Sequence, residues 1–250
     1  MIALTHDSIS LRGAGIVTVS QQKKGARFTL DSLLLADFCR IKPKERILEP
    51  GAGTGIISIL LARKFPKGLF YPVEIQTDLA SLCYQNIRAN DLAETVIVIE
   101  RDIRFLKRSM LPGGFDAIVT NPPYTRLGTG KQSPIPGRLA ARHEQTASLG
   151  KWLDLRYFLK NKGRYYMVFP AGRMAELVAL MKVRKLEPKR MRFVHPSVGK
   201  PASLVLIEAV TSAGTGLEVL PPLVLHESGG GYSEEMRRIY GLSQEDNKSN

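Results

Sequence analysis

Short apolar runs and segments of helical periodicity alternate along most of this chain. Segments 55–64 and 78–90 carry apolar residues at helical spacing, and each lies between two apolar runs. Those runs have the length and composition of buried strands, at 46–50, 69–75, 95–100 and 115–120. Strands that alternate with helices predict a doubly wound α/β sheet that is mainly parallel.

The second half of the chain continues this alternation and then breaks it. We expect a helix over 149–159, a strand over 163–169 and a helix over 174–183. The run 188–195 alternates like a strand, and 203–210 returns without an intervening helix. The last pair is therefore expected to be antiparallel, which predicts seven strands, one of them antiparallel, with helices on both faces.

The two ends of the chain differ from this central region. Alternating residues near the start predict a small β-hairpin over 1–30, in front of a main domain over 31–225. Asp31 and Ser32 directly precede an apolar stretch, which predicts a helix start with its N-cap. A glycine-rich segment and a polar end predict a mobile tail over 226–250.

The composition is that of a globular chain. With 250 residues, 44% of them hydrophobic, the chain can bury one sizeable core. No apolar run approaches the ~18 residues that span a membrane, and the start lacks the basic and apolar segments of a signal peptide. Cys39 and Cys83 lie far apart among apolar neighbours, which predicts buried free thiols, no metal site and a reducing cytoplasm.

The charge balance indicates a polyanionic partner. The chain carries 36 Lys and Arg against 23 Asp and Glu, a net charge of +13. A basic surface without such a partner has the same balance, so composition alone leaves both interpretations open. The basic residues gather in three groups, which favours a folded basic face: Lys182, Arg184, Lys185, Lys189, Arg190 and Arg192; Arg101, Arg104, Lys107 and Arg108; and Arg126, Lys131, Arg138 and Arg142.

A glycine-rich turn joins the first core strand to the first core helix. It reads Glu49-Pro-Gly-Ala-Gly-Thr-Gly55, and glycine there lets the backbone approach a ligand closely. In the dinucleotide fingerprint the third glycine stands one position later, where this chain has Ile56. The spacing departs from that of a pyrophosphate binder and suits S-adenosylmethionine, which has an uncharged linker and an amino-acid tail.

Acidic residues stand at the ends of three successive predicted strands. They are Glu49, Glu74 and Asp102. The carboxyl ends of parallel strands share one sheet edge, where ligands of open α/β sheets bind. Glu74 is placed to accept hydrogen bonds from two ribose hydroxyls, and Asp102 from an adenine amino group. Each alone is commonly a surface carboxylate, but the three together indicate a site for an adenosine-containing cofactor.

The fourth strand ends in Asn121-Pro-Pro-Tyr124, at the same edge. We interpret these four residues as catalytic. The Asn121 side-chain oxygen and the Pro122 carbonyl can each accept an N–H from an exocyclic amine, which orients its lone pair toward a methyl donor. Pro123 stiffens the turn, and Tyr124 can stack on a flat base. An Asn-Pro turn that merely ends a strand is the plainer alternative, and the upstream acids favour the functional one.

These motifs together resemble those of class I S-adenosylmethionine-dependent methyltransferases of amino groups. More narrowly, the chain is similar to the bacterial tRNA(Val) adenine-N6 methyltransferase group over residues 10–225, through segments 28–35, 73–76, 141–144 and 194–196. Glu49 departs from the family, which more often has Asp there. The resemblance implies a Rossmann-like fold, S-adenosylmethionine as cofactor, and methylation of adenine N6 in a tRNA near the anticodon.

The motifs and the resemblance assign roles to individual residues. Asp31 would lie near the methionine end of the cofactor, and a helix N-cap explains it equally well. The expected cofactor-binding residues are Asp31, Glu49, Gly51, Ala52, Gly53, Gly55, Glu74, Ile75, Asp102, Ile103 and Asn121. The expected substrate-binding residues are Tyr124, Arg126, Arg142, Lys185, Lys189 and Arg190. Arg142 and Glu144 fit a base pocket or a loop ion pair equally.

Other functions stay open from the sequence. Release-factor glutamine methyltransferases also use Asn-Pro-Pro-Tyr, but they usually carry a helical domain where this chain has residues 1–45, and the charge of +13 favours a nucleic acid. DNA adenine and rRNA guanine-N2 enzymes typically add a recognition domain. A non-catalytic, basic RNA-binding module with this fold is the non-enzymatic alternative, and the intact acids, glycines and Asn121 argue against it.

Overall fold

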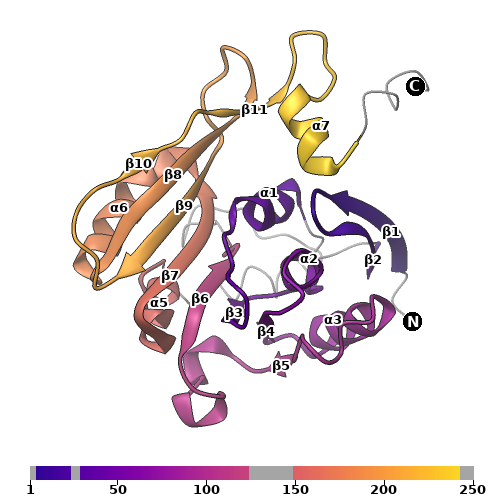
Figure 1. The fold of residues 1–250 in the computed structure, drawn as a ribbon, viewed down its shortest axis with the longest axis vertical. Coiled ribbons are helices and arrows are strands. Elements are labelled where there is room, and N and C mark those ends of the chain that lie inside the picture. Colours follow the sequence, from indigo (N-terminus) through magenta and orange to yellow (C-terminus); the bar gives the residue numbers. More distant parts are fainter. Residues whose placement is uncertain (1–3, 24–28, 124–148, 243–250) are drawn as a thin grey trace, which may run out of the picture.

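A mixed sheet covered by helices on both faces forms the centre of the molecule, as the computed structural model shows (Figure 1). The structure describes residues 4–23, 29–123 and 149–242. Along the chain, its strands are β1 (Leu4–Leu11), β2 (Gly15–Gln22), β3 (Arg46–Pro50), β4 (Leu69–Glu74), β5 (Ile99–Glu100), β6 (Phe115–Thr120), β7 (Leu159–Pro170), β8 (Leu186–Ser197), β9 (Leu204–Thr211), β10 (Glu218–Val219) and β11 (Leu223–His226).

The helices up to α6 alternate with the strands in the order that the sequence predicted. The α-helices are α1 (Leu30–Phe38), α2 (Ile56–Lys64), α3 (Thr77–Ala89), α5 (Leu149–Asp154), α6 (Met174–Val183) and α7 (Glu234–Tyr240). Short 3-10 helices are η1 (Ile103–Phe105), η2 (Arg108–Met110), η4 (Leu155–Phe158) and η5 (Ala171–Arg173). No helix in the described part of the chain is long and apolar enough to cross a bilayer.

The strand order confirms the predicted fold class. The sheet runs β10-β8-β9-β7-β6-β3-β4-β5, with β11 also paired to β8. Strand β9 is antiparallel to both β7 and β8, and the other pairs in the sheet are parallel. The described sheet has nine strands where the sequence predicted seven, because β10 and β11 each add a short parallel pairing to β8.

Alternation along the strands separates two cores. Tyr166 and Val168 of β7 point into the core beneath α1, α2, α3 and α7, whereas Tyr165 and Met167 point into the core beneath α5 and α6. Successive residues of a strand face opposite sides of its sheet, so a continuously apolar strand such as β7 must be covered on both faces. The buried free thiols expected at Cys39 and Cys83 are confirmed, and both contribute to the first core.

The N-terminal hairpin is confirmed and docks on helix α3. Strands β1 and β2 pair antiparallel, and Val17 and Val19 are buried in the first core. The Asn86 amide accepts from the Ser20 N–H (2.8 Å) and donates to the Ser20 carbonyl (3.0 Å), as a peptide group of a neighbouring strand would. Asn90 bonds Thr18 in the same way, at 3.1 and 2.7 Å. These side chains therefore provide hydrogen-bond partners for the backbone N–H and C=O groups of Thr18 and Ser20 at the edge of β2, where no further described strand pairs.

Three local expectations differ from the structure. Helix α1 begins at Leu30 with Thr29 as its N-cap, so the cap predicted at Asp31 and Ser32 is wrong and Asp31 lies in the first turn. The strand predicted over 95–100 is reduced to β5, since before Ile99 only Val96 forms a bridge, to Phe70. The helix predicted over 149–159 ends at Asp154, and its last turn becomes η4.

The C-terminal segment contains a helix where the sequence predicted a mobile tail. Ser233 caps α7 by accepting from the Met236 N–H (3.2 Å), and Gly241 ends the helix at φ +67°. Met236 and Ile239 are buried in the first core. These two apolar residues on one helical face, together with the hydrogen bond from the Arg12 N–H to the Ile239 carbonyl (2.8 Å), attach this segment to the domain.

Candidate active site

The ends of three neighbouring strands bring the sequence motifs together at one sheet edge. Strand β3 lies between β4 and β6, and all three run parallel. Their carboxyl ends lead directly into the glycine-rich turn after Pro50, the turn after Glu74, and the turn that starts at Asn121. The structure thereby places the predicted glycine, acidic and asparagine motifs side by side at the edge where α/β sheets bind ligands.

The glycine-rich turn is held against β4 and stays open on its other side. The N–H groups of Gly51 and Ala52 both donate to the Val73 carbonyl, at 2.8 and 3.0 Å. Gly51, Gly53 and Gly55 have φ values of +70°, +57° and +83°, which favour glycine. A Cβ built on Gly53 would meet no described atom within 4 Å, so the backbone there is open to a ligand.

Glu74 ties this turn to the end of β4. Its Oε2 accepts from the Gly53 N–H (2.8 Å), and its Oε1 accepts from the N–H groups of Ile75 and Gln76 (2.9 Å each). The side chain is buried. A carboxylate has about four acceptor positions. The three backbone bonds therefore use most of them and hold the carboxylate against the glycine-rich turn, so the predicted ribose contact would have to use the remaining acceptor position.

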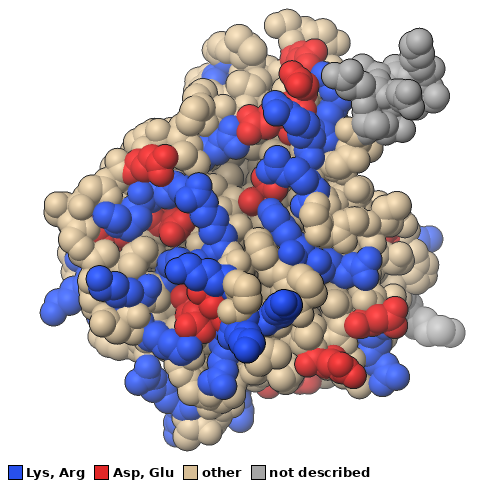
Figure 2. Space-filling model, viewed as in Figure 1, with Lys and Arg blue, Asp and Glu red and all other residues tan. Residues whose placement is uncertain are grey.

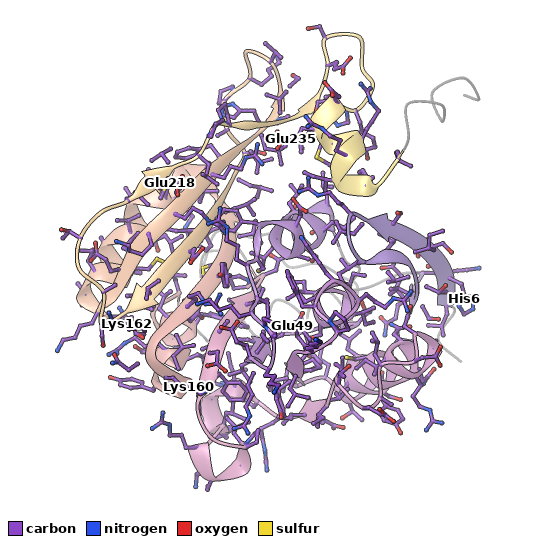
Figure 3. All side chains as sticks on the ribbon, viewed as in Figure 1. His6, Glu49, Lys160, Lys162, Glu218 and Glu235 are labelled. Atoms are coloured by element: carbon purple, nitrogen blue, oxygen red, sulfur yellow. The ribbon has the colours of Figure 1, made fainter. Side chains whose placement is uncertain are left out.

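Glu49 is directed into the protein and holds the start of helix α2. Its Oε2 accepts from the Ser58 N–H (2.8 Å) and from the Ser58 hydroxyl. Only 2% of the residue is exposed, and it lies at the centre of the molecule (Figure 3). Burial raises the pKa of Glu49 to about 8, and the nearby Glu74 adds to the effect while the bonds from Ser58 oppose it. Glu49 therefore stabilises the glycine-rich turn from the protein interior, by binding the first turn of α2.

This environment predicts a pH dependence of stability. The folded-state pKa of about 8 lies above the ordinary value of 4.5, so the folded protein binds the extra proton between these limits. The contribution of this proton to the free energy of unfolding is complete below pH 4.5 and is lost as the pH rises through 8. The free energy of unfolding changes by at most about 1.4 kcal/mol per pH unit on this account. We expect Glu49→Gln to remove this slope from the free energy of unfolding, measured by urea denaturation from pH 5 to 8.5. Equal slopes in both proteins would contradict the burial argument.

Asp102 follows β5 and caps helix η1. Its Oδ1 accepts from the Arg104 N–H, and its Oδ2 accepts from the Arg104 Nε, both at 2.8 Å. The side-chain bond from Arg104 is the main cause that lowers the pKa of Asp102, so the carboxylate is ionised. Ile103, the next predicted cofactor residue, is half-buried beside it. An adenine amino group would share this carboxylate with Arg104.

Two long-range hydrogen bonds hold the turn that carries Asn121. The Thr120 hydroxyl donates to the Pro50 carbonyl (3.0 Å), which joins the ends of β6 and β3. The Asn121 Nδ2 donates to the Ser32 hydroxyl on α1 (3.2 Å), and Ser32 is 5% exposed. Pro122 is buried and Pro123 is exposed. With its NH2 directed at α1, the Asn121 amide carries its oxygen on the opposite side.

The sequence missed three residues that hold this site. Ser32 and Thr120 carry the bonds just described, and the Asn86 Nδ2 donates to the Thr54 carbonyl within the glycine-rich turn (3.0 Å). A hydroxyl or amide gives little sequence signal, because its partner lies far along the chain. Asp31, expected near the cofactor, is half-buried in the first turn of α1, next to Ser32.

The predicted substrate-binding residues are not all at this edge. Arg190 is buried: its Nη2 lies 3.1 Å from Glu208 Oε2 and donates to the Phe38 carbonyl, so its assignment to an RNA face is wrong. Lys185 and Lys189 lie at the start of β8, the opposite edge of the sheet, and their contact with a large RNA stays a prediction. Tyr124, Arg126, Arg142 and Glu144 lie outside the described residues.

Comparisons with known proteins agree with this arrangement. The family model described as "Methyltransferase small domain" matches residues 15–142. A protein from Tolumonas auensis, named tRNA1(Val) (adenine(37)-N6)-methyltransferase, is 30% identical over 194 residues, which cover 76% of this chain and 78% of the relative. A protein of the same name from Porphyromonas gingivalis is 28% identical over 231 residues, covering 88% and 89% of the two chains.

Solved structures with the same fold are more distant in sequence. A structure described as a predicted O-methyltransferase from Agrobacterium tumefaciens superposes with a TM-score of 0.67 at 20% identity, covering 85% of this chain and 96% of the other. The aTrm5 chain in its complex with tRNALeu superposes with a TM-score of 0.57 at 13% identity, covering 84% of this chain and 53% of the other. At these identities the likeness concerns the fold.

Proposed function

The chain belongs to the methyltransferase small domain family, and we propose that it uses S-adenosylmethionine to methylate the N6 amino group of an adenine in tRNA. The names of the relatives point to adenine 37 of tRNA1(Val), the adenine beside the anticodon. The observation that carries the proposal is the Asn121 turn, held beside an open glycine-rich turn at one sheet edge.

The residues at this edge fit the cofactor. Gly53 offers an open backbone surface, and Glu74 lies directly beside it with oxygens that accept hydrogen bonds. Ribose hydroxyls are donors that suit such a carboxylate. Gly51, Ala52, Ile75, Asp102 and Ile103 line the same edge, and Asp31 lies near it on α1. When bound, S-adenosylmethionine supplies an electrophilic methyl group on a cationic sulfur.

Asn121 then acts by orienting the acceptor amine. The N6 lone pair of adenine is delocalised into the ring, so the free amine is a poor nucleophile. The Asn121 Oδ1 and the Pro122 carbonyl accept its two N–H bonds, which directs the lone pair away from them and favours the positive charge that develops on nitrogen. Pro122 is buried, and the Thr120 bond to Pro50 keeps both acceptors at a fixed position relative to the glycine-rich turn.

Ser32 is expected to control the rate through Asn121. We predict that Ser32→Ala lowers kcat about tenfold, because the amide loses the bond that fixes which end faces the amine. KM for tRNA and the Kd for S-adenosylmethionine should stay unchanged, as should the thermal midpoint within a few degrees. Ser32→Thr keeps the hydroxyl and should recover most of kcat. A Ser32→Ala enzyme with the wild-type kcat would contradict this role.

One experiment tests the proposed function directly. The wild-type protein is incubated with methyl-labelled S-adenosylmethionine and, separately, with total tRNA, rRNA or a release factor, and the digested products are identified by mass spectrometry. We expect N6-methyladenosine in the tRNA sample alone. Methylglutamine in the release factor, or N2-methylguanosine in rRNA, would replace the proposal by one of those activities.

A further inference from the structure

A cleft of about 370 Å³ lies between helix η1 and the α5–η4 segment, beside the candidate active site. Its apolar walls are formed by Ile103, Leu106, Leu155 and Phe158, and its polar rim by Arg104, Lys151, Asp154 and Tyr157. We propose that this cleft binds a second, unstacked base of the tRNA strand that presents the target adenine. The inference rests on the proposed function, since it names where that RNA lies.

The cleft adjoins the cofactor edge, and Ile103, one of the expected cofactor-binding residues, lines one of its walls. One wall, η1, begins directly after its N-cap Asp102, and Ile103 and Arg104 of this wall line the cleft together with Lys151 of the other. The other wall, α5, packs its Trp152 ring on the glycine-rich turn: a Cβ on Gly51 would come within 2.8 Å of that ring. None of Glu49, Gly53 or Glu74 lines the cleft.

The α5–η4 wall is rigid, which suits a recognition surface. The Tyr165 hydroxyl of β7 donates to the Trp152 carbonyl (2.6 Å), and Trp152, Leu153 and Leu155 are buried in the second core. The Arg184 Nε donates to the Asp154 carboxylate (2.9 Å) and to the Gly150 carbonyl (3.1 Å). A wall fixed in this way loses little conformational freedom when a base binds.

Tyr157 gives this wall an aromatic platform. The residue is 64% exposed, and the Arg156 guanidinium lies 4.3 Å from its ring centroid. A tyrosine ring backed by an arginine offers a flat stacking surface that accepts any base. Proteins recognise single-stranded RNA by stacking its splayed bases on such rings. The apolar residues of the cleft lie beside the ring, so a base stacked on Tyr157 can be buried against them, away from water.

The charge around the cleft fits an RNA strand. The exposed basic residues on and next to its walls include Arg101, Lys107, Arg108 and Lys151, whereas Arg104 is paired with Asp102. The two acids, Asp102 and Asp154, are already paired with Arg104 and Arg184. Figure 2 shows one face of the molecule, on which Lys and Arg predominate over Asp and Glu. Phosphates neutralised by the basic residues at the cleft would hold the strand while Tyr157 holds its base.

The test separates this inference from the proposed function. Binding of unmodified tRNA is measured by fluorescence anisotropy, and methyl transfer to the same tRNA is measured by mass spectrometry. We expect Tyr157→Ala to raise both Kd and KM for tRNA about tenfold, with kcat and the cofactor Kd unchanged. Tyr157→Phe keeps the ring and should behave as the wild type does.

Tyr84 supplies the matched control. It is 51% exposed on α3 and also carries an arginine, Arg88, at 5.9 Å from its ring centroid, yet it lies away from the cleft. Tyr84→Ala should leave tRNA binding unchanged. A wild-type protein that binds tRNA without methylating it would refute the proposed function alone. Unchanged tRNA binding in Tyr157→Ala, or an equal loss in Tyr84→Ala, would refute the cleft as a base site.

Discussion

Replacing Asn121 by alanine is expected to reduce methyl transfer to tRNA by about 10²–10³-fold. The side chain provides an acceptor for the target amine, and its amide is held by Ser32 of α1 while Thr120 ties the end of β6 to Pro50. Affinity for S-adenosylmethionine should stay near the wild-type value, because the glycine-rich turn and Glu74 belong to β3 and β4. Single-turnover methylation and calorimetric cofactor binding measure the two quantities separately.

Asn121→Asp is the informative companion to that variant. Aspartate keeps an acceptor oxygen at the same position, and the Ser32 hydroxyl can donate to it instead of accepting. We therefore expect Asn121→Asp to keep more activity than Asn121→Ala. If Asn121→Ala methylates tRNA at the wild-type rate, the role of this residue is wrong. If Asn121→Ala instead loses both methyl transfer and cofactor binding, Asn121 acts on the cofactor and not on the amine.

The sequence predicted those parts of the site in which each residue lies at the end of its own strand or in the turn after it. The glycine-rich turn, Glu74, Asp102 and Asn121 each follow an apolar run, and parallel strands must end at a common edge. The same argument could not find Ser32, because its bond to Asn121 joins positions 89 residues apart. It also assigned Glu49 to the cofactor, whereas the structure turns the carboxylate toward Ser58.

Charge clusters in the sequence were a poorer guide than motifs. Lys185, Lys189 and Arg190 are neighbours along the chain, but alternation in β8 and pairing with β9 place Arg190 inside the protein against Glu208. An arginine in a strand next to a glutamate can be buried, because the pair satisfies both charges. The basic residues on and next to the walls of the cleft come from two separate segments, 101–108 and 151–156, and the first of these is one of the groups that the sequence singled out.

The largest effect on stability is expected at Gly55. Its φ is +83°, and a Cβ there would lie 2.4 Å from the Cys83 Sγ on the buried face of α3. Alanine at this position would be strained by its backbone by about 1–2 kcal/mol and would add an overpacking cost of about 1–3 kcal/mol. We expect Gly55→Ala to lower the free energy of unfolding by the sum of both. Gly53 has a similar φ of +57°, but a Cβ there would meet no described atom within 4 Å. Gly53→Ala should therefore lower the free energy of unfolding by the backbone cost alone, while still weakening cofactor binding.

A double-mutant cycle with Cys83 separates strain from crowding. Cys83→Ala removes the sulfur that the new methyl group would meet, so it should restore the packing part of the loss in Gly55→Ala and leave the backbone part. The two changes should therefore be coupled by about 1–3 kcal/mol in urea denaturation. Additive losses would mean that α3 moves away from the turn at little cost. The glycine-rich turn would then be free to shift as well, and its third glycine would serve the backbone conformation alone.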